Sequence, residues 1–126
     1  MLKAWLKLSI EAEKCSLGEL SIVIGSDNWL KELNNQYLKH NHYTDVITFD
    51  TSAERNIING DILISYDRVK ENALELALPF DIELARVMIH GVLHLIGFDD
   101  KQPNNKVKMT KKEDYYLEQL DCLRST

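Results

Sequence analysis

The sequence predicts an α+β fold, in which about five helices cover a small mixed β-sheet that is four-stranded at most and three-stranded at least. Three observations support this class. Short β-branched, apolar runs are separated by longer segments with helical periodicity. Capping residues or prolines mark several of the boundaries between them. The chain has 126 residues without an internal repeat or linker, so we expect a single domain over residues 1–126.

The first third of the chain is expected to form a helix, a strand and a second helix. Residues 3–14 are amphipathic, with apolar residues on one side and charged residues on the other. Residues 20–25 are apolar and β-branched, which is typical of a strand. Ser26 or Asp27 then caps a helix that continues to about Lys39. The predicted buried side chains of this second helix are Trp29, Leu30, Leu33 and Tyr37.

Two further strands are expected in the middle of the chain. Residues 46–49 form one of them, and residues 60–65 form the other, whose nearly continuous apolar run predicts burial on both faces. A helix separates the first two strands, which favours a right-handed parallel crossover between them. The shorter link before the third strand permits a hairpin. Parallel and antiparallel pairs together give a mixed sheet.

Three helices are expected in the rest of the chain. The first covers residues 67–78 and ends before Pro79, because proline cannot continue a helix. Asp81 is expected to cap a helix over about residues 82–96, and the last helix covers about residues 106–123. The side chains of the last helix that are available for packing are Val107, Met109, Tyr116, Leu117 and Leu120.

Composition indicates an ordinary globular protein, with 44% hydrophobic and 28% charged residues. The net charge of −5 argues against a protein that binds nucleic acid by bulk charge. The chain has no apolar run that could span a bilayer and no signal-peptide core, so we expect a cytoplasmic protein without a membrane partner. In the cytoplasm, Cys15 and Cys122 are expected to be reduced thiols.

A run of lysines between residues 101 and 112 contains no acidic residue. We interpret the run first as a solvated helix face, with a place beside a bound metal as the alternative. Its members are Lys101, Lys106, Lys108, Lys111 and Lys112.

The helix over residues 82–96 carries the most specific pattern in the chain. His90 and His94 are four residues apart, so they share one helix face with Cβ atoms about 5–6 Å apart. Two imidazoles at this spacing can bind one metal ion. Gly97 is suited to end the helix, which would return Asp99 or Asp100 to the same ion as a third ligand.

Alternative interpretations of these histidines are weaker. Two histidines near a helix end are often only polar residues close to the helix dipole, but here the flanks are strongly apolar. Gly91 costs about 1 kcal/mol relative to alanine inside a helix, which indicates close packing or access to an ion. A His-Glu-x-x-His peptidase carries its general base at that position, so proteolysis is not expected. His40 and His42 are possible ligands, but we expect them to be solvated in a loop.

The segment His90-Gly-x-Leu-His94-Leu-x-Gly97-Phe-Asp99 resembles the signature of the YbeY family of bacterial metal-dependent endoribonucleases. Two more blocks, which begin at Leu33 and at Gly60, resemble the family in the same order. They read Leu33-Asn34-x-x-Tyr37 with Thr44-Asp45-Val46-Ile47-Thr48-Phe49, and Gly60-Asp61-Ile62-Leu63-Ile64-Ser65. The resemblance covers roughly residues 30–100 and is far more specific than a pair of histidines. It implies a zincin-like metal-binding helix in a single YbeY-like metallohydrolase domain.

The family pattern has three zinc-binding histidines, at spacing His-x3-His-x5-His. Its third position falls on Asp100, so the resemblance implies one Zn²⁺ bound by His90, His94 and Asp100, with Asp99 as a possible substitute. Iron or nickel would also suit these ligands. His90 and Asp99 are the predicted catalytic residues, with Asp99 orienting water or a histidine ring. Leu38 stands where the family commonly has a catalytic arginine, which suggests reduced or altered nuclease activity.

The resemblance implies a single-strand-specific endoribonuclease in ribosome biogenesis. Its expected roles are maturation of the 3′ end of 16S rRNA and ribosome quality control. The expected partners are precursor rRNA and the ribosome or a ribosomal protein, with no small organic cofactor. The two departures from the pattern leave a non-catalytic or weakly catalytic assembly factor as an alternative. A small-molecule metal hydrolase is a third, which would need a closed apolar pocket rather than an open basic groove.

Overall fold

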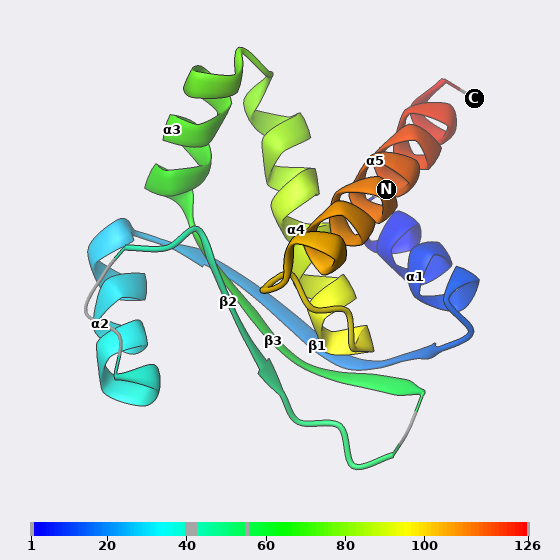
Figure 1. Ribbon diagram of the computed structural model, residues 1–126, viewed down its shortest axis with the longest axis horizontal. Coiled ribbons are helices and arrows are strands. Elements are labelled where there is room, and N and C mark those ends of the chain that lie inside the picture. The colour runs from blue at the N-terminus through cyan, green and yellow to red at the C-terminus, as the bar shows by residue number, and fades with distance from the viewer. Residues whose placement is uncertain (1, 40–42, 55, 126) are drawn as a thin grey trace.

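In the computed structural model, which describes residues 2–39, 43–54 and 56–125, the chain forms five helices and one three-stranded sheet (Figure 1). In chain order the elements are α1 Leu2–Ala12, β1 Ser16–Gly25, α2 Asp27–Leu38, β2 Val46–Asp50, β3 Ile57–Ser65, α3 Tyr66–Leu76, α4 Phe80–Ile96 and α5 Pro103–Arg124. The α+β class is confirmed, and the sheet has the smaller of the two predicted strand numbers. Cys15 and Cys122 are free thiols, as expected. Within these described ranges, no helix combines the length and apolar character needed to cross a bilayer.

The order of strands in the sheet is β1–β3–β2, so β3 is the central strand. β2 and β3 pair antiparallel and form the predicted hairpin. The predicted parallel crossover from the first strand to the second is wrong, because β1 pairs parallel with β3 while β2 occupies the other edge of β3. The parallel connection therefore includes both α2 and β2 before the chain returns beside β1 (Figure 1).

The structure also corrects the bounds and the burial of the strands. β1 begins at Ser16, four residues before its predicted start, and its pairing with β3 shifts register between Leu17 and Leu20. In β3 every second residue from Ile58 to Ile64 is buried, and the residues between them are half-buried. The prediction that both faces of this strand are fully buried is therefore wrong, because a continuous apolar run does not show how much of each face another element covers.

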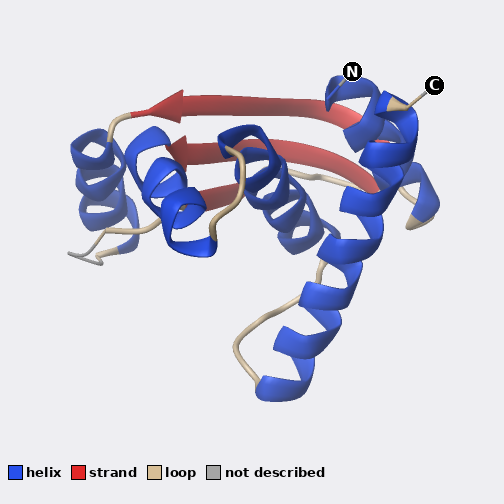
Figure 2. Cartoon of the chain, turned by 90° about the horizontal axis from the view of Figure 1, so that it is seen from above, coloured by secondary structure: helices blue, strands red, loops and turns tan. Residues whose placement is uncertain are grey.

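α4 lies across β2 and β3, and α1 and α5 pack beside it on the same side of the strands (Figures 1 and 2). Trp5 of α1, Ile62 of β3 and Leu93 of α4 are fully or almost fully buried in the core that these elements share. The Trp5 indole N–H donates a hydrogen bond to the carbonyl of Tyr116 at 2.7 Å, which joins α1 to α5. α4 is thus held by packed elements around it, and such support fixes the direction of its side chains.

Gly91 brings α4 close to the sheet. A Cβ atom at this position would lie 2.9 Å from Cγ2 of Ile62 and 3.3 Å from Cγ2 of Thr48. Distances this short would force the buried Ile62 and the half-buried Thr48 side chains to move, at a cost of about 1–3 kcal/mol. Close packing therefore explains the glycine between the two histidines.

α2 covers the opposite face of the hairpin. Ser26 is its N-cap, with the hydroxyl oxygen accepting a hydrogen bond from the Trp29 backbone N–H at 3.1 Å. Leu30 is buried as predicted, but Tyr37 is 60% exposed and Asn34 is buried in its place. The predicted buried face of this helix is therefore wrong at its C-terminal end, where the Tyr37 ring contacts Phe49 of β2 only edge-on and the polar residue Asn34 faces inward.

The ends of α4 and α5 also differ from the prediction. α4 begins at Phe80 after Pro79, without a side-chain cap. Asp81 lies in the first turn, where it accepts a hydrogen bond from Arg124 at 3.2 Å instead of capping the helix. α5 begins three residues earlier than predicted, and Val107 in its first turns is exposed rather than packed.

Candidate metal centre

The last turns of α4 hold the two motif histidines. Their apolar neighbours Ile89 and Leu93 are fully buried, so the imidazoles extend from a firmly packed helix. Gly97 ends the helix with φ of 123°, a conformation that favours glycine, and its N–H donates to the carbonyls of Leu93 and His94. This reversal returns the chain toward the histidines, as the sequence predicts.

Three side chains converge beyond this reversal. His90 Nε2 lies 3.0 Å from His94 Nε2, and the two nitrogens lie 3.4 Å and 3.6 Å from Oδ2 of Asp100. Four ligands bound tetrahedrally at 2.0–2.1 Å stand about 3.3 Å from one another. The three atoms therefore have the spacing of three corners of a tetrahedral metal site, and they fit a zinc-sized ion without rearrangement.

The neighbouring aspartate lies elsewhere. Asp99 is exposed, and its Oδ1 accepts a hydrogen bond from the backbone N–H of Lys101 at 3.1 Å. Such a bond stabilises the turn that presents Asp100. In the described part of the chain, the group of metal-binding side chains comprises His90, His94 and Asp100 and leaves Asp99 outside. His40 and His42 lie outside the described residues.

A buried carboxylate orients one of the histidines. Glu113 of α5 is only 5% exposed, and its Oε2 lies 2.5 Å from His90 Nδ1. A carboxylate in this place selects the tautomer with the proton on Nδ1, which leaves Nε2 free to bind a metal. Glu113 was missed in the sequence. The available signal was its spacing, because it shares one face of α5 with the buried residues Met109, Tyr116 and Leu120.

A second ion pair fixes that carboxylate. Arg86 donates to Glu113 at 3.3 Å, and it also donates twice to Glu83, at 2.7 Å from Nε and 2.5 Å from a terminal nitrogen. Glu83 is completely buried and also accepts a hydrogen bond from Asn72 at 3.4 Å. The chain Glu83–Arg86–Glu113–His90 therefore connects the core of α4 to the metal-binding nitrogen.

The same contacts set the protonation of His90. Burial lowers the pKa of its imidazole, but the hydrogen bond and charge of Glu113, together with Asp100 and Asp45, outweigh burial and raise the pKa above the ordinary 6.5. In the absence of metal, the pair therefore stabilises the fold fully below pH 6.5. This stabilisation is lost as the pH rises through the raised pKa.

The substitution Glu113→Gln tests this role. We expect it to weaken metal binding by about 10–100-fold, the usual effect of removing a partner of a ligating histidine. We also expect the pKa of His90 to fall, because the amide has no charge. Metal affinity measured by competition with a chelator and an NMR titration of His90 in the chelated protein provide the two readouts.

Glu118→Gln, at an exposed acid of the same helix, is the matched control and should leave both values unchanged. An unchanged His90 pKa in Glu113→Gln would contradict the proposed orientation of the imidazole.

The three converging side chains line one wall of a cleft of about 490 Å³ between α2, β2 and the α4–α5 loop. Most of its lining is polar. The described lining residues are Asn34, Leu38, Thr44, Asp45, Val46, Ile47, Thr48, His90, His94, Asp100 and Lys101. Leu38 thus faces the site, at the position where the resemblance implies an arginine. The cleft has room for an extended polar substrate beside the metal ligands.

Comparison with known proteins agrees with this geometry. The model of the family described as Endoribonuclease YbeY matches residues 1–121. The chain belongs to the YbeY family. Endoribonuclease YbeY of Karelsulcia muelleri is 47% identical over 113 residues, which cover 90% of this chain and 79% of the relative. Endoribonuclease YbeY of Flavobacterium psychrophilum is 48% identical over 113 residues, which cover 90% and 80%.

A solved structure supports the fold as well. The solution structure of TM1509 from Thermotoga maritima matches with a TM-score of 0.72 and 33% identity, over 98% of this chain and 82% of that one. The YbeY resemblance inferred from the motif and the upstream blocks is therefore confirmed across nearly the whole length of the chain.

Proposed function

We propose that residues 1–126 act as one metallohydrolase domain that cleaves single-stranded RNA internally. The observation that carries this proposal is the convergence of His90, His94 and Asp100, whose ligand atoms all lie within 4.8 Å of one another beside an open polar cleft. Relatives that are named endoribonucleases support RNA as the substrate. The proposed setting is ribosome biogenesis in the cytoplasm, including 3′-end maturation of 16S rRNA and ribosome quality control.

Zinc is the proposed metal, because two imidazoles and one carboxylate form a common catalytic zinc site with one position left open. A bound ion of this kind supplies a Lewis acid and lowers the pKa of a coordinated water. His90 presents Nε2 under the control of Glu113, and Asp100 adds negative charge. In place of a direct catalytic role for Asp99, we propose that it positions the loop through its bond to the Lys101 backbone.

Phosphate binding in the cleft requires a cation other than the arginine that Leu38 replaces. Among the described residues that line the cleft, Lys101 carries the positive charge. We propose that its ammonium group contacts a phosphate next to the cleaved bond. A single lysine provides a point charge rather than the two-pronged contact of arginine, so we expect slower cleavage than in a protein that has the arginine.

Removal of the metal tests the activity. An end-labelled single-stranded RNA should be cut by the zinc-loaded protein, and the products should disappear when a chelator is added and return when zinc is restored. The same sequence in a perfect duplex should resist cleavage. Equal cutting with and without chelator would overturn the metal-dependent reaction.

The absence of an arginine at Leu38 favours one second candidate, an assembly factor that binds RNA with little or no cleavage. Such a factor would bind the labelled RNA equally with zinc and with chelator, and it would release no products in either case. A small-molecule hydrolase is less well supported, because the cleft is lined mainly by polar groups instead of an enclosed apolar surface.

A further inference from the structure

A second groove lies on the other side of the α4–α5 loop, between the end of α1 and the middle of α5. It has a volume of about 500 Å³, and we name it the lysine–tyrosine groove. Its lining residues are Ala12, Glu13, Phe98, Lys108, Lys111, Lys112, Tyr115 and Tyr116. We propose that this groove binds the single-stranded RNA that extends from the metal centre. The inference rests on the proposed function, and it assigns the path of the substrate.

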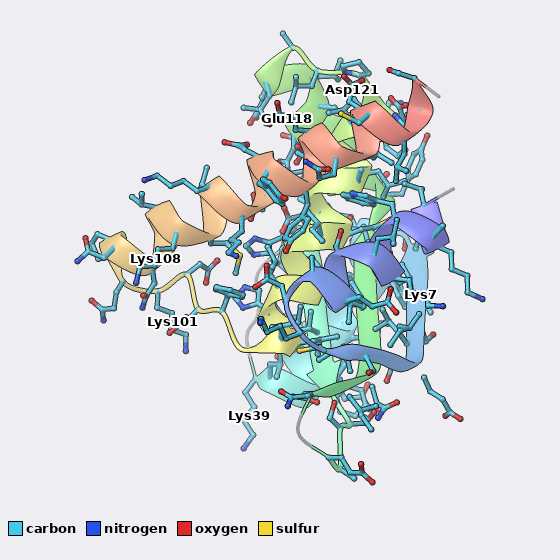
Figure 3. The ribbon with its side chains drawn as sticks, turned by 90° about the vertical axis from the view of Figure 1, so that its right-hand side faces the viewer. Lys7, Lys39, Lys101, Lys108, Glu118 and Asp121 are labelled. Atoms are coloured by element: carbon cyan, nitrogen blue, oxygen red, sulfur yellow. The ribbon has the colours of Figure 1, made fainter. Side chains whose placement is uncertain are left out.

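Charge is the first argument. The chain is acidic overall, yet five of its fifteen lysines and arginines lie in residues 101–112. Lys101 and Lys108 both project from the same end of the molecule, at the loop before α5 and at its first turns (Figure 3). A polyanion would therefore meet a local positive surface that the net charge conceals.

Lys108 and Lys111 are the groove lysines available to a ligand. Lys112 is paired with Glu13 at 2.9 Å, and the Tyr116 hydroxyl donates to the same carboxylate. In the described residues no carboxylate pairs with Lys108 or Lys111, which are exposed and stand three residues apart on one face of α5. The acidic residue of the groove is thus already neutralised, and two ammonium groups are left for phosphates.

Aromatic side chains provide the second argument. Tyr115 is 52% exposed, and its ring is held edge-on against Tyr116 with centroids 5.1 Å apart. Phe98 lies under the ammonium group of Lys112, 5.6 Å from its ring centroid. Phe98 is half-buried, so Tyr115 is the exposed ring on which a base can stack. An exposed ring beside lysines that bind the backbone is a usual means of holding single-stranded nucleic acid without sequence preference.

Continuity with the metal centre provides the third argument. Phe98 lines the groove, and Asp100 belongs to the ligand cluster. Two residues of extended chain span at most about 7 Å. Lys101, which follows Asp100 in the loop before α5, lines the cleft that contains the metal ligands. A single-stranded RNA that crosses the α4–α5 loop can therefore contact both the metal ligands and the groove. An acidic peptide would use the lysines but has no comparable use for the exposed tyrosine.

Binding of a fluorescein-labelled, twelve-nucleotide single-stranded RNA tests the inference. The protein is kept in chelator so that the RNA stays intact, and the dissociation constant is measured by anisotropy at several salt concentrations. For Lys108→Gln/Lys111→Gln we expect about tenfold weaker binding. We also expect the slope of log K against log salt to decrease in magnitude by about 1.4, because two phosphate contacts are lost. Tyr115→Ala should weaken binding about fivefold with an unchanged slope.

Lys7→Gln/Lys70→Gln is the matched control, because it removes two exposed lysines outside the groove. It should change the affinity less than twofold. Equal losses in the two double variants, or no loss in either, would overturn the groove as the RNA path. A competition experiment adds polyglutamate or unlabelled RNA to the complex with labelled RNA. If polyglutamate displaces the labelled RNA as effectively as unlabelled RNA does, the groove is not an RNA path, and an acidic protein partner is favoured instead.

Cleavage of the same oligonucleotide in zinc separates this inference from the proposed function. If the RNA binds through the groove but is never cut, the proposed nuclease activity is wrong and the proposed binding groove stands. If Lys108→Gln/Lys111→Gln binds the RNA with unchanged affinity and cuts it normally, the proposed binding groove is wrong and the proposed nuclease activity stands.

Discussion

Replacing Asp100 with alanine is expected to reduce metal-dependent RNA cleavage by about 10³-fold, the largest effect on activity that we predict. The substitution removes one of three converging ligand atoms, whose distances from the two imidazole nitrogens are 3.4 Å and 3.6 Å. Two neutral imidazoles alone bind a divalent ion much more weakly. The zinc content of the purified protein should therefore fall together with the cleavage rate.

Two further substitutions make this experiment specific. Asp100→His introduces the histidine that the resemblance implies at this position, and it should keep zinc and retain cleavage within about tenfold. Asp99→Ala removes an exposed acid that lies outside the cluster, so it should keep the metal. Zinc bound normally by Asp100→Ala but lost by Asp99→Ala would show that the wrong aspartate has been assigned.

Replacing Glu83 with alanine is expected to destabilise the fold by about 3 kcal/mol, because the half-buried Arg86 guanidinium loses the closer of its two carboxylate partners and keeps only Glu113 at 3.3 Å. Glu83 is completely buried and accepts two hydrogen bonds from Arg86. The hydrogen bond to Glu83 is the largest influence on the pKa of Arg86 and raises it above its ordinary value. Without Glu83 the guanidinium still stays charged, because an arginine is protonated at any pH at which the protein is folded. A domain of this size has a total stability of about 5–15 kcal/mol, so urea unfolding should show a large shift of the midpoint.

A double substitution distinguishes the pair from its charges. Glu83→Leu/Arg86→Met replaces both partners with apolar groups of similar size, and it should recover most of the lost stability. It should weaken metal binding, because Glu113 then lacks the guanidinium that holds it against His90. Full stability in Glu83→Ala would refute the idea that this buried pair supports α4.

The elements that the sequence predicted best are those set by local periodicity. The helix that carries His90 and His94 and its end at Gly97 agree with the structure, because both follow from contacts within a few residues. The strand order failed, since the pairing of β1 with β3 depends on which edge of a strand is free after the whole chain has folded. Tyr37 was misplaced because helical spacing gives a face but not how closely the sheet covers it, and its ring contacts Phe49 of β2 only edge-on and stays 60% exposed.

The sequence by itself determined that two imidazoles share one helix face, that an acidic pair follows the helix end, and that the blocks around them belong to the YbeY family. Helix spacing left Asp99 and Asp100 as alternative ligands and the resemblance implied Asp100, and the tertiary structure places Asp100 at the imidazoles and Asp99 away from them. Only the tertiary structure brought Glu113, twenty-three positions further along the chain, to His90. The physical reason is that spacing along a helix fixes directions within one element. The approach of side chains from different elements depends on how the elements pack, here on Gly91 against the sheet and on the Arg86 bridge between α4 and α5.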